Sequence, residues 1–385
     1  MKGFTVLVFA AVLCGPVRAG SEYADVTGGR IMGEVVENVA VFKGIPFAAP
    51  PVGALRWQTP QPVIAWTGVR AATTFAPACM QQPWYPTAPS QPSEDCLYLN
   101  VWTAAPSSKE RRPVIVWIHG GGLTQGMSWE RLSYGNKLAQ EGVVLVSIAY
   151  RLGPFGFLAH PELTREKGNG SGNYGLFDSL AALKWVQANI TQFGGDPARV
   201  TIMGGSSGAL TVGLLAAAPQ AKGAFARAIA VGGSAFYPRL NEDLVQTTPR
   251  YSLRGAEAKG RKLFKSLGVT HLKAARAIPA QKLITVAQSA NLEFGAIFDG
   301  DLVQRPNTEL YAQGEFNDTP ILVGFTSAEE GEAPPETSVK SLKAEMARQL
   351  PCPETHAAIL AAYPFATEEQ AKLVYRAWQR DLWSG

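Results

Sequence analysis

The pentapeptide Gly204-Gly205-Ser206-Ser207-Gly208 has the form G-x-S-x-G and joins two apolar segments. The segment before it, 199–203, reads as a strand, and the segment after it, 209–212, reads as the start of a helix. A strand that reverses into a helix so quickly holds the central serine in a strained backbone conformation. Such a turn also needs very small residues two positions before and after the serine. The stretch therefore predicts a nucleophile elbow with Ser206 at its tip.

A run of glycines follows another predicted strand. Residues 113–118 are mostly apolar, and His119-Gly120-Gly121-Gly122 comes directly after them. Glycines at such a place let backbone N–H groups approach a developing oxyanion, which side chains would prevent. Phosphate binding is the alternative, but no Gly-Lys-Ser/Thr follows at P-loop spacing and the run does not continue as G-x-G-x-x-G. The motif is therefore interpreted as an oxyanion hole.

Further blocks of sequence occur in a fixed order between about Gly29 and Gly331. They are Gly44-Ile45-Pro46-Phe47-Ala48, Pro50-Pro51-Val52-Gly53-Ala54-Leu55-Arg56-Trp57, Ser93-Glu94-Asp95-Cys96-Leu97-Tyr98-Leu99-Asn100-Val101, Tyr150-Arg151-Leu152-Gly153, Gly172-Asn173-Tyr174-Gly175-Leu176-Phe177-Asp178 and Phe193-Gly194-Gly195-Asp196-Pro197. With these blocks the chain resembles the type-B carboxylesterases, the family of the cholinesterases and the bacterial p-nitrobenzyl esterases. The resemblance implies an α/β-hydrolase fold with a mostly parallel central sheet and helices on both faces. It also implies a small N-terminal β hairpin region and a helical lid insertion, with the family's last strands missing from this chain.

The resemblance assigns roles to individual residues. Ser206 would be the nucleophile, and the N–H groups of Gly121, Gly122 and Ser207 would form the oxyanion hole. It also implies a disulfide between Cys79 and Cys96, and ion pairs between Arg56 and Glu94 and between Arg151 and Asp178.

The triad acid is expected after the strand at 320–324. Counting from the end of that strand gives Glu329, whereas the glycine that normally follows the acid, Gly331, comes after Glu330. We follow the count from the strand, because the strand anchors the loop, and predict Glu329.

The chain departs from the family at three places. Gly205 stands where the family normally has glutamate, and Ser207 where it normally has alanine. The third departure is that no histidine occupies the triad position. Of the four histidines, His119, His160 and His271 precede the acid. Only His356 follows it, in a segment that reads as the start of a helix and not as a catalytic loop.

These observations give a function with one alternative. The expected function is that of a secreted serine carboxylesterase that hydrolyses small-molecule carboxylic esters through an acyl-enzyme, in a chain that looks C-terminally truncated and has little activity of its own. The alternative is a catalytically inactive member of the fold that acts as a binding protein, or a non-functional fragment. No cofactor and no metal site are expected.

Composition and the N-terminus complete the sequence-based description. Residues 1–19 have a lysine, a short apolar run and small residues before Gly20, as in a cleaved signal peptide. Residues 20–385 are expected to form one incomplete α/β-hydrolase domain that is secreted or periplasmic. The net charge of +4 is small and its Lys and Arg residues are scattered, which argues against nucleic-acid binding. No other stretch reaches the length of a membrane span.

Apolar runs and helical periodicity place the main elements. A hairpin is predicted at 31–42 around Glu37-Asn38, a strong helix at 174–190, and an inserted helical region at 233–291 with helices at 255–267 and 280–288. Strands are predicted at 97–103, 114–119, 143–149, 199–204, 226–232 and 320–324.

Overall fold

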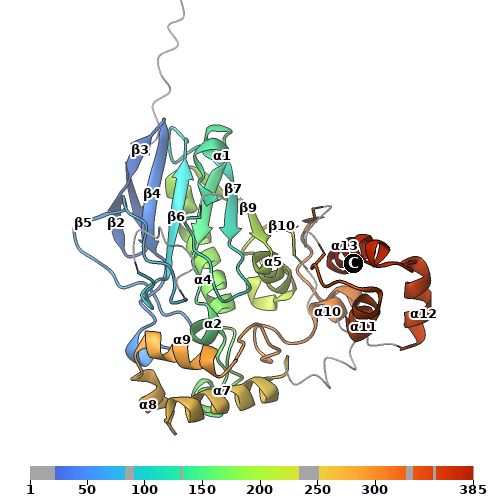
Figure 1. Cartoon of the computed structure of the whole chain (residues 1–385). Helices are drawn as coiled ribbons and strands as arrows, with labels where there is room; N and C mark the ends of the chain where they lie inside the picture. The colour runs from blue at the N-terminus through green and yellow to red at the C-terminus, as the bar shows by residue number, and fades with distance from the viewer. Residues whose placement is uncertain are drawn as a thin grey trace, which may run out of the picture.

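An eight-stranded mixed sheet forms the centre of the molecule (Figure 1). The computed structural model describes residues 22–82, 91–130, 133–233, 251–326, 333–349 and 353–384. Strand order is β11-β10-β9-β7-β8-β6-β4-β3, parallel from β11 to β8 and antiparallel from β8 to β3. The bounds are β3 Glu34–Val36, β4 Val39–Pro46, β6 Tyr98–Thr103, β7 Arg112–Ile118, β8 Val144–Ile148, β9 Gly195–Gly205, β10 Arg227–Val231 and β11 Ile321–Gly324.

Burial explains why the sequence indicates these strands so clearly. Every residue of β8 is buried, as expected for a strand covered on both faces, so its apolar run is unbroken. The six strands predicted from apolar runs are all present, although β9 begins at Gly195 instead of Arg199. At the edge, β11 is more exposed, with Leu322 at 61%.

The predicted N-terminal hairpin is present, but it is shorter than expected. Glu37 and Asn38 both have positive φ, 50° and 61°, which suits a tight two-residue turn between β3 and β4. The preceding residues leave this sheet at Gly33. They form a separate three-stranded sheet, with β1 Tyr23–Val26, β2 Gly29–Met32 and β5 Val69–Ala71.

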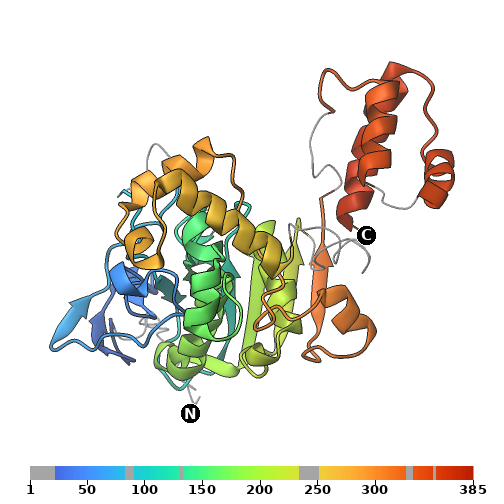
Figure 2. The same ribbon diagram turned by 90° about the horizontal axis from the view of Figure 1, so that it is seen from below.

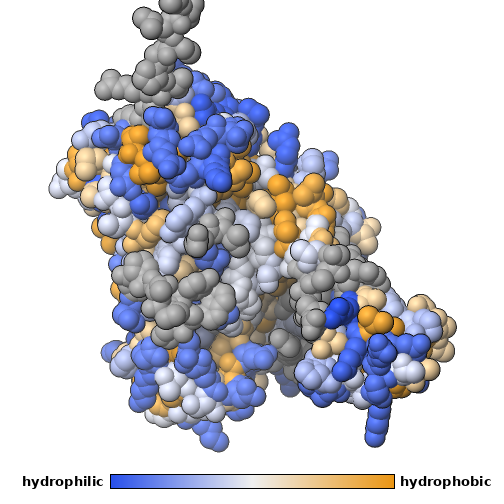
Figure 3. Space-filling model, turned by 45° about the horizontal axis from the view of Figure 1, so that its top comes forward, coloured by the Kyte–Doolittle hydropathy of each residue, from blue (hydrophilic) through white to orange (hydrophobic). Residues whose placement is uncertain are grey.

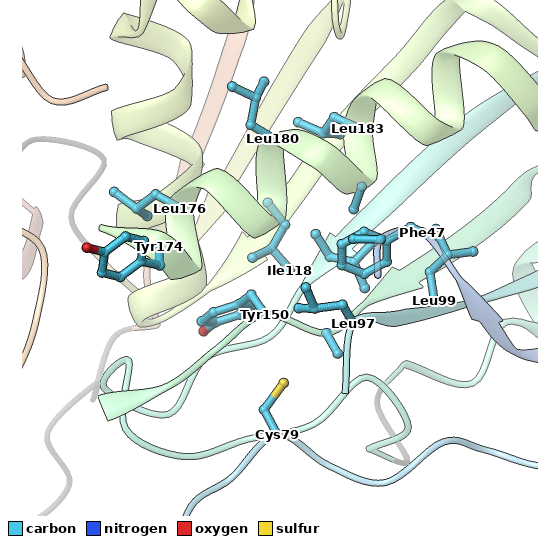
Figure 4. Close-up of a cluster of buried hydrophobic side chains, with 14 of the residues drawn as sticks. Phe47, Cys79, Leu97, Leu99, Ile118, Tyr150, Tyr174, Leu176, Leu180 and Leu183 are labelled. Atoms are coloured by element: carbon cyan, nitrogen blue, oxygen red, sulfur yellow. The ribbon is translucent and has the colours of Figure 1, made fainter. Parts of the chain in front are cut away.

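Helices cover both faces of the central sheet. On one face, α4 (Tyr174–Asn189) and α5 (Ser207–Ala217) pack on the main hydrophobic core, part of which is drawn in Figure 4. The predicted helix at 174–190 thus corresponds to α4, and its Trp185 is a core residue. On the other face, α1 (Asn136–Gln140) packs near a smaller cluster that includes Trp102 and Leu145.

The inserted region is helical, as predicted. It contains α7 (Leu253–Leu267), α8 (Leu272–Arg276) and α9 (Ala280–Ser289). These helices pack beside α2 (Gly153–Phe157), α3 (Pro161–Lys167) and the short turn η1 (Gly53–Leu55), where the Phe264 ring stacks on His160 with centroids 4.0 Å apart. Residues 234–250, which connect β10 to this region in the sequence, lie outside the described residues, so the lid stays a prediction.

The last helices form a group of their own, away from the sheet (Figure 2). They are α11 Val339–Gln349, α12 Pro353–Ala362 and α13 Glu368–Ser384. Leu342, Met346 and Trp378 belong to the apolar cluster that holds them together. Helix α10 (Asn307–Ala312), which precedes β11 in the sequence, contacts α5.

Small hydrophobic groups lie among mostly hydrophilic residues on the surface drawn in Figure 3. Within the residues that the structure describes, no helix is both long enough and apolar enough to cross a membrane.

Candidate active site

Ser206 lies at the turn between β9 and α5. Its φ of 54° and ψ of −123° fall in a strained region for a residue with a side chain, as predicted for a nucleophile elbow. The Ser206 N–H donates to the carbonyl oxygen of Val231 on the neighbouring strand, at 2.9 Å. The serine is exposed, whereas Gly204 and Gly208 are buried. The turn therefore presents the hydroxyl at the carboxyl end of the parallel strands.

Close backbone contacts explain the glycines around this serine. A Cβ at Gly204 would lie 2.3 Å from the backbone of Gly208, and one at Gly208 would lie 2.2 Å from the carbonyl oxygen of Ile118. A Cβ at Gly233 would meet the Ser206 carbonyl at 2.3 Å. At Gly205, by contrast, the nearest atom would be 3.3 Å away, on the Trp117 ring. These contacts require glycine at positions 204, 208 and 233, whereas a side chain at position 205 would need only a small shift of the Trp117 ring.

The glycine run after β7 lies directly beside the elbow. A Cβ at Gly120 would be 3.1 Å from the Ser206 Cβ. Gly121 and Gly122 have φ of 105° and 65°, values that glycine adopts easily. The structure thus brings together Ser206 and both predicted parts of the oxyanion hole, the glycine run and the N-terminus of α5. We call residues 119–126 the oxyanion loop.

Two buried rings, His119 at the start of the oxyanion loop and Tyr150, pack against each other. The His119 and Tyr150 rings stack with centroids 4.3 Å apart, and the Tyr150 hydroxyl donates to the His119 carbonyl at 2.8 Å. His119 Nδ1 lies 2.8 Å from the Gly120 carbonyl, so it carries the proton of a neutral ring. Burial lowers the pKa of His119 to about 4. The ring is therefore a structural support and a poor proton acceptor at neutral pH.

Gln81 is a residue of this region that the sequence analysis missed. Its buried amide accepts from the Gly126 N–H at 2.9 Å and donates to the Gly126 carbonyl at 2.7 Å. It also donates to the Cys79 carbonyl at 3.0 Å. The amide joins the far end of the oxyanion loop to the disulfide loop. Its place two residues after Cys79 is the only clue in the sequence.

The predicted disulfide and both ion pairs are present. Cys79 and Cys96 are bonded. Arg56 pairs with Glu94 at 2.5 Å and also donates to two carbonyl oxygens in and after α8. Arg151 pairs with the fully buried Asp178 at 2.7 Å.

The remaining predicted site residues are not near Ser206 or are not described. Glu329 and Glu330 lie outside the described residues, and of His356 only its place in α12 is described. His160 stacks on Phe264 and caps α3, and His271 precedes α8. Within the described part of the chain, no histidine nitrogen forms a hydrogen bond with the Ser206 hydroxyl.

A mostly parallel sheet with a strained serine between strand and helix, faced by a glycine loop, defines the α/β-hydrolase class. The carboxylesterase family model matches residues 21–366. The chain belongs to the carboxylesterase family.

Individual relatives agree with this membership. The fumonisin B1 esterase of Sphingopyxis macrogoltabida is 42% identical over 308 residues, which are 77% of this chain and 54% of that protein. Carboxylesterase 1F of Mus musculus is 35% identical over 364 residues, covering 85% of this chain and 62% of the relative. The chain thus spans between half and two thirds of the length of these relatives.

Solved structures give the same fold. Carboxylesterase Est55 of Geobacillus stearothermophilus, crystallised at pH 6.2, matches with a TM-score of 0.75 and 32% identity, covering 92% of this chain and 74% of that one. A PNB esterase matches with a TM-score of 0.79 and 32% identity, covering 94% and 75% respectively.

Proposed function

We propose that this protein hydrolyses carboxylic esters through an acyl-enzyme formed on Ser206. The hydroxyl attacks the ester carbonyl, the alcohol leaves, and water releases the acid from the serine. The N–H groups of Gly121, Gly122 and Ser207 stabilise the negative charge that develops on the carbonyl oxygen.

The observation that carries this proposal is the approach of the oxyanion loop to the elbow. Gly120 lies against the Ser206 side chain, so an ester carbonyl attacked by that serine is next to the loop's N–H groups. The exposure of Ser206 supports the same conclusion, because a substrate must reach the hydroxyl. Glu329 is proposed as the acid that orients the general base.

The general base decides how active the 385-residue chain is. His119 is held neutral in the core, and His160 is stacked on Phe264 and caps α3. Ser206 without a base remains a neutral alcohol and a weak nucleophile. We therefore propose that this chain is a slow esterase to which a small external base can restore activity.

Imidazole supplies such a base in solution and provides the test. Hydrolysis of p-nitrophenyl butyrate is measured with rising imidazole, for the unchanged chain and for Ser206→Ala. The expected result is an imidazole-dependent rate above that of free imidazole in the unchanged chain only, with a butyryl adduct on Ser206 detected by mass spectrometry. Equal rates in both proteins would refute the proposal.

A second function is favoured by the lack of a histidine partner for Ser206 among the described side chains. It is that of an inactive member of the fold that binds esters, or another ligand, without cleaving them. This function predicts no rescue by imidazole and no adduct.

The comparisons support a proposal for the substrate class. We propose neutral carboxylic esters, and an ester panel should include fumonisin B1 because a relative carries that name. Faster turnover of amides or phosphoesters than of any ester would contradict this proposal.

Secretion is also proposed. It is supported by the signal-like sequence at 1–19, which lies outside the described residues, and by the Cys79–Cys96 disulfide, since such bonds persist mainly in oxidising compartments. N-terminal sequencing of protein exported by the native host is expected to begin at Gly20. Retention of residues 1–19 in mature protein would contradict this.

A further inference from the structure

Three consecutive residues of the oxyanion loop have positive φ. They are Gly121 at 105°, Gly122 at 65° and Leu123 at 61°. This conformation is easy for glycine but costly for a leucine, whose Cβ crowds the following carbonyl. Such a residue keeps its conformation only where its surroundings hold it there. Leu123 is therefore the position at which this loop depends most on contacts from elsewhere.

Both backbone groups of Leu123 are fixed by hydrogen bonds. Its carbonyl accepts from the N–H of Gly153 at 2.8 Å, and its N–H donates to the Oγ of Ser207 at 3.2 Å. Its side chain is buried, with 3% exposed. The bond from Leu123 joins the loop to the first residue of α5, directly after Ser206.

The same serine hydroxyl also interacts with Tyr150. Burial raises the pKa of the Tyr150 hydroxyl above its usual value, and a hydrogen bond with the Ser207 side chain opposes this rise. Tyr150 in turn donates to the His119 carbonyl at 2.8 Å. His119 and Leu123, which flank the three glycines, are thus held by the hydroxyl groups of Tyr150 and Ser207, respectively.

We infer that the Ser207 hydroxyl is a positioning group for the oxyanion hole. The Ser207 backbone N–H is one proposed donor to the oxyanion, and its side chain holds the loop that carries the other two. One residue therefore sets the spacing between the two halves of the hole. The inference rests on the proposed function for its catalytic consequence, but not for the structural link itself.

Hydrogen exchange measures the structural link without any substrate. Amide exchange of the loop, 120–125, is followed by mass spectrometry in the unchanged chain, in Ser207→Ala and in Ser179→Ala. Ser179 is a matched control because it is a buried serine whose hydroxyl donates to one backbone carbonyl, that of Gly175 at 3.1 Å in α4. Loss of one neutral hydrogen bond should speed exchange of the loop about three- to tenfold in Ser207→Ala only.

Imidazole-rescued hydrolysis measures the catalytic consequence. Ser207→Ala keeps the backbone donor, so KM should be unchanged while the rescued kcat falls about three- to tenfold. The rescued kcat of Ser179→Ala should equal that of the unchanged chain.

The two measurements separate the possible failures. Unchanged loop exchange in Ser207→Ala, or equal acceleration in Ser179→Ala, overturns the inference whether or not esters are cleaved. Faster exchange with an unchanged rescued kcat overturns the positioning role in catalysis. Absence of rescue in the unchanged chain refutes the proposed function alone, and faster loop exchange in Ser207→Ala then still supports the link between loop and helix.

Discussion

The side-chain amide of Gln81 pairs with both backbone groups of Gly126, much as a neighbouring strand would. Because Gly126 ends the oxyanion loop and Gln81 follows Cys79, this contact fixes the loop to the disulfide-bonded segment. Gln81 is 4% exposed, so water does not replace the amide if it is removed.

Gln81→Met is expected to destabilise the protein and to lower rescued turnover. The methionine has a similar size but leaves buried backbone groups of Gly126 and Cys79 unpaired, which costs about 2–3 kcal/mol. Urea unfolding and the rescued kcat measure the two effects. Gln187→Met is the control, since Gln187 also donates to two carbonyl oxygens, of Pro197 and Ala224, but on α4. A loss of rescued kcat as large in the control would show that general destabilisation is the cause.

The 385-residue chain without imidazole is expected to hydrolyse p-nitrophenyl acetate extremely slowly. Loss of the histidine of a serine triad lowers kcat on the order of a millionfold. Initial rates for the unchanged chain and Ser206→Ala should therefore be nearly equal when no external base is present. A rate normal for an esterase, abolished by Ser206→Ala, would require a base that this chain supplies itself, and His356→Ala would then identify or exclude that histidine.

Stability should fall as the pH drops below neutrality, in part because of His119. Burial lowers its folded-state pKa from 6.5 to about 4, so the unfolded chain binds the proton more tightly. The contribution of His119 to the free energy of unfolding is complete above pH 6.5 and is lost as the pH falls from 6.5 towards 4. The loss amounts to about 2 kcal/mol between pH 7 and pH 5. Urea unfolding of the unchanged chain and of His119→Phe at both pH values measures this.

The contribution of His119 is isolated by comparing how the free energy of unfolding changes with pH in the unchanged chain and in His119→Phe. Burial also lowers the pKa of His160, so both proteins retain some pH dependence. The expected result is a smaller loss of stability for His119→Phe between pH 7 and pH 5. Identical losses in the two proteins would mean that His119 does not titrate in this way.

Removal of Arg151 should be among the most damaging single changes to the fold. Asp178 is fully buried, and Arg151→Met would leave its carboxylate without a counter-charge, at a cost of about 3–5 kcal/mol. Arg305→Met is the matched control because the Arg305–Glu315 pair is exposed and worth less than about 1 kcal/mol. Chemical unfolding gives both values, and a loss for Arg151→Met no larger than that of the control would contradict the prediction.

The elements that the sequence predicted best are those with a strong local signal. Strand β8 is buried throughout, so its apolar run is unbroken, and the elbow has glycines at fixed spacing from Ser206. The small sheet was not predicted, because its strands have only three or four residues and alternate between exposed and buried positions.

Of the candidate site, the sequence predicted the serine of the elbow and the glycine run. Ser206 and the glycine run carry motifs, whereas Gln81 and Tyr150 act through contacts with residues 45 and 31 positions away, respectively. No pattern in a single sequence shows which of many glutamines or tyrosines makes such a contact. The proposed acid, Glu329, lies outside the described residues and stays a prediction.

The close packing around the elbow also affects how such a motif should be interpreted in evolution. Gly204, Gly208 and Gly233 each lie against backbone atoms that cannot move aside, so a lineage that no longer cleaved esters would still be under selection to keep them in order to fold. The exposed Ser206 side chain is under no comparable steric requirement and is free to drift once catalysis is no longer selected. Retention of the glycines therefore indicates only that the fold is kept. Retention of the serine among natural homologues of this chain is the better indicator of a working enzyme.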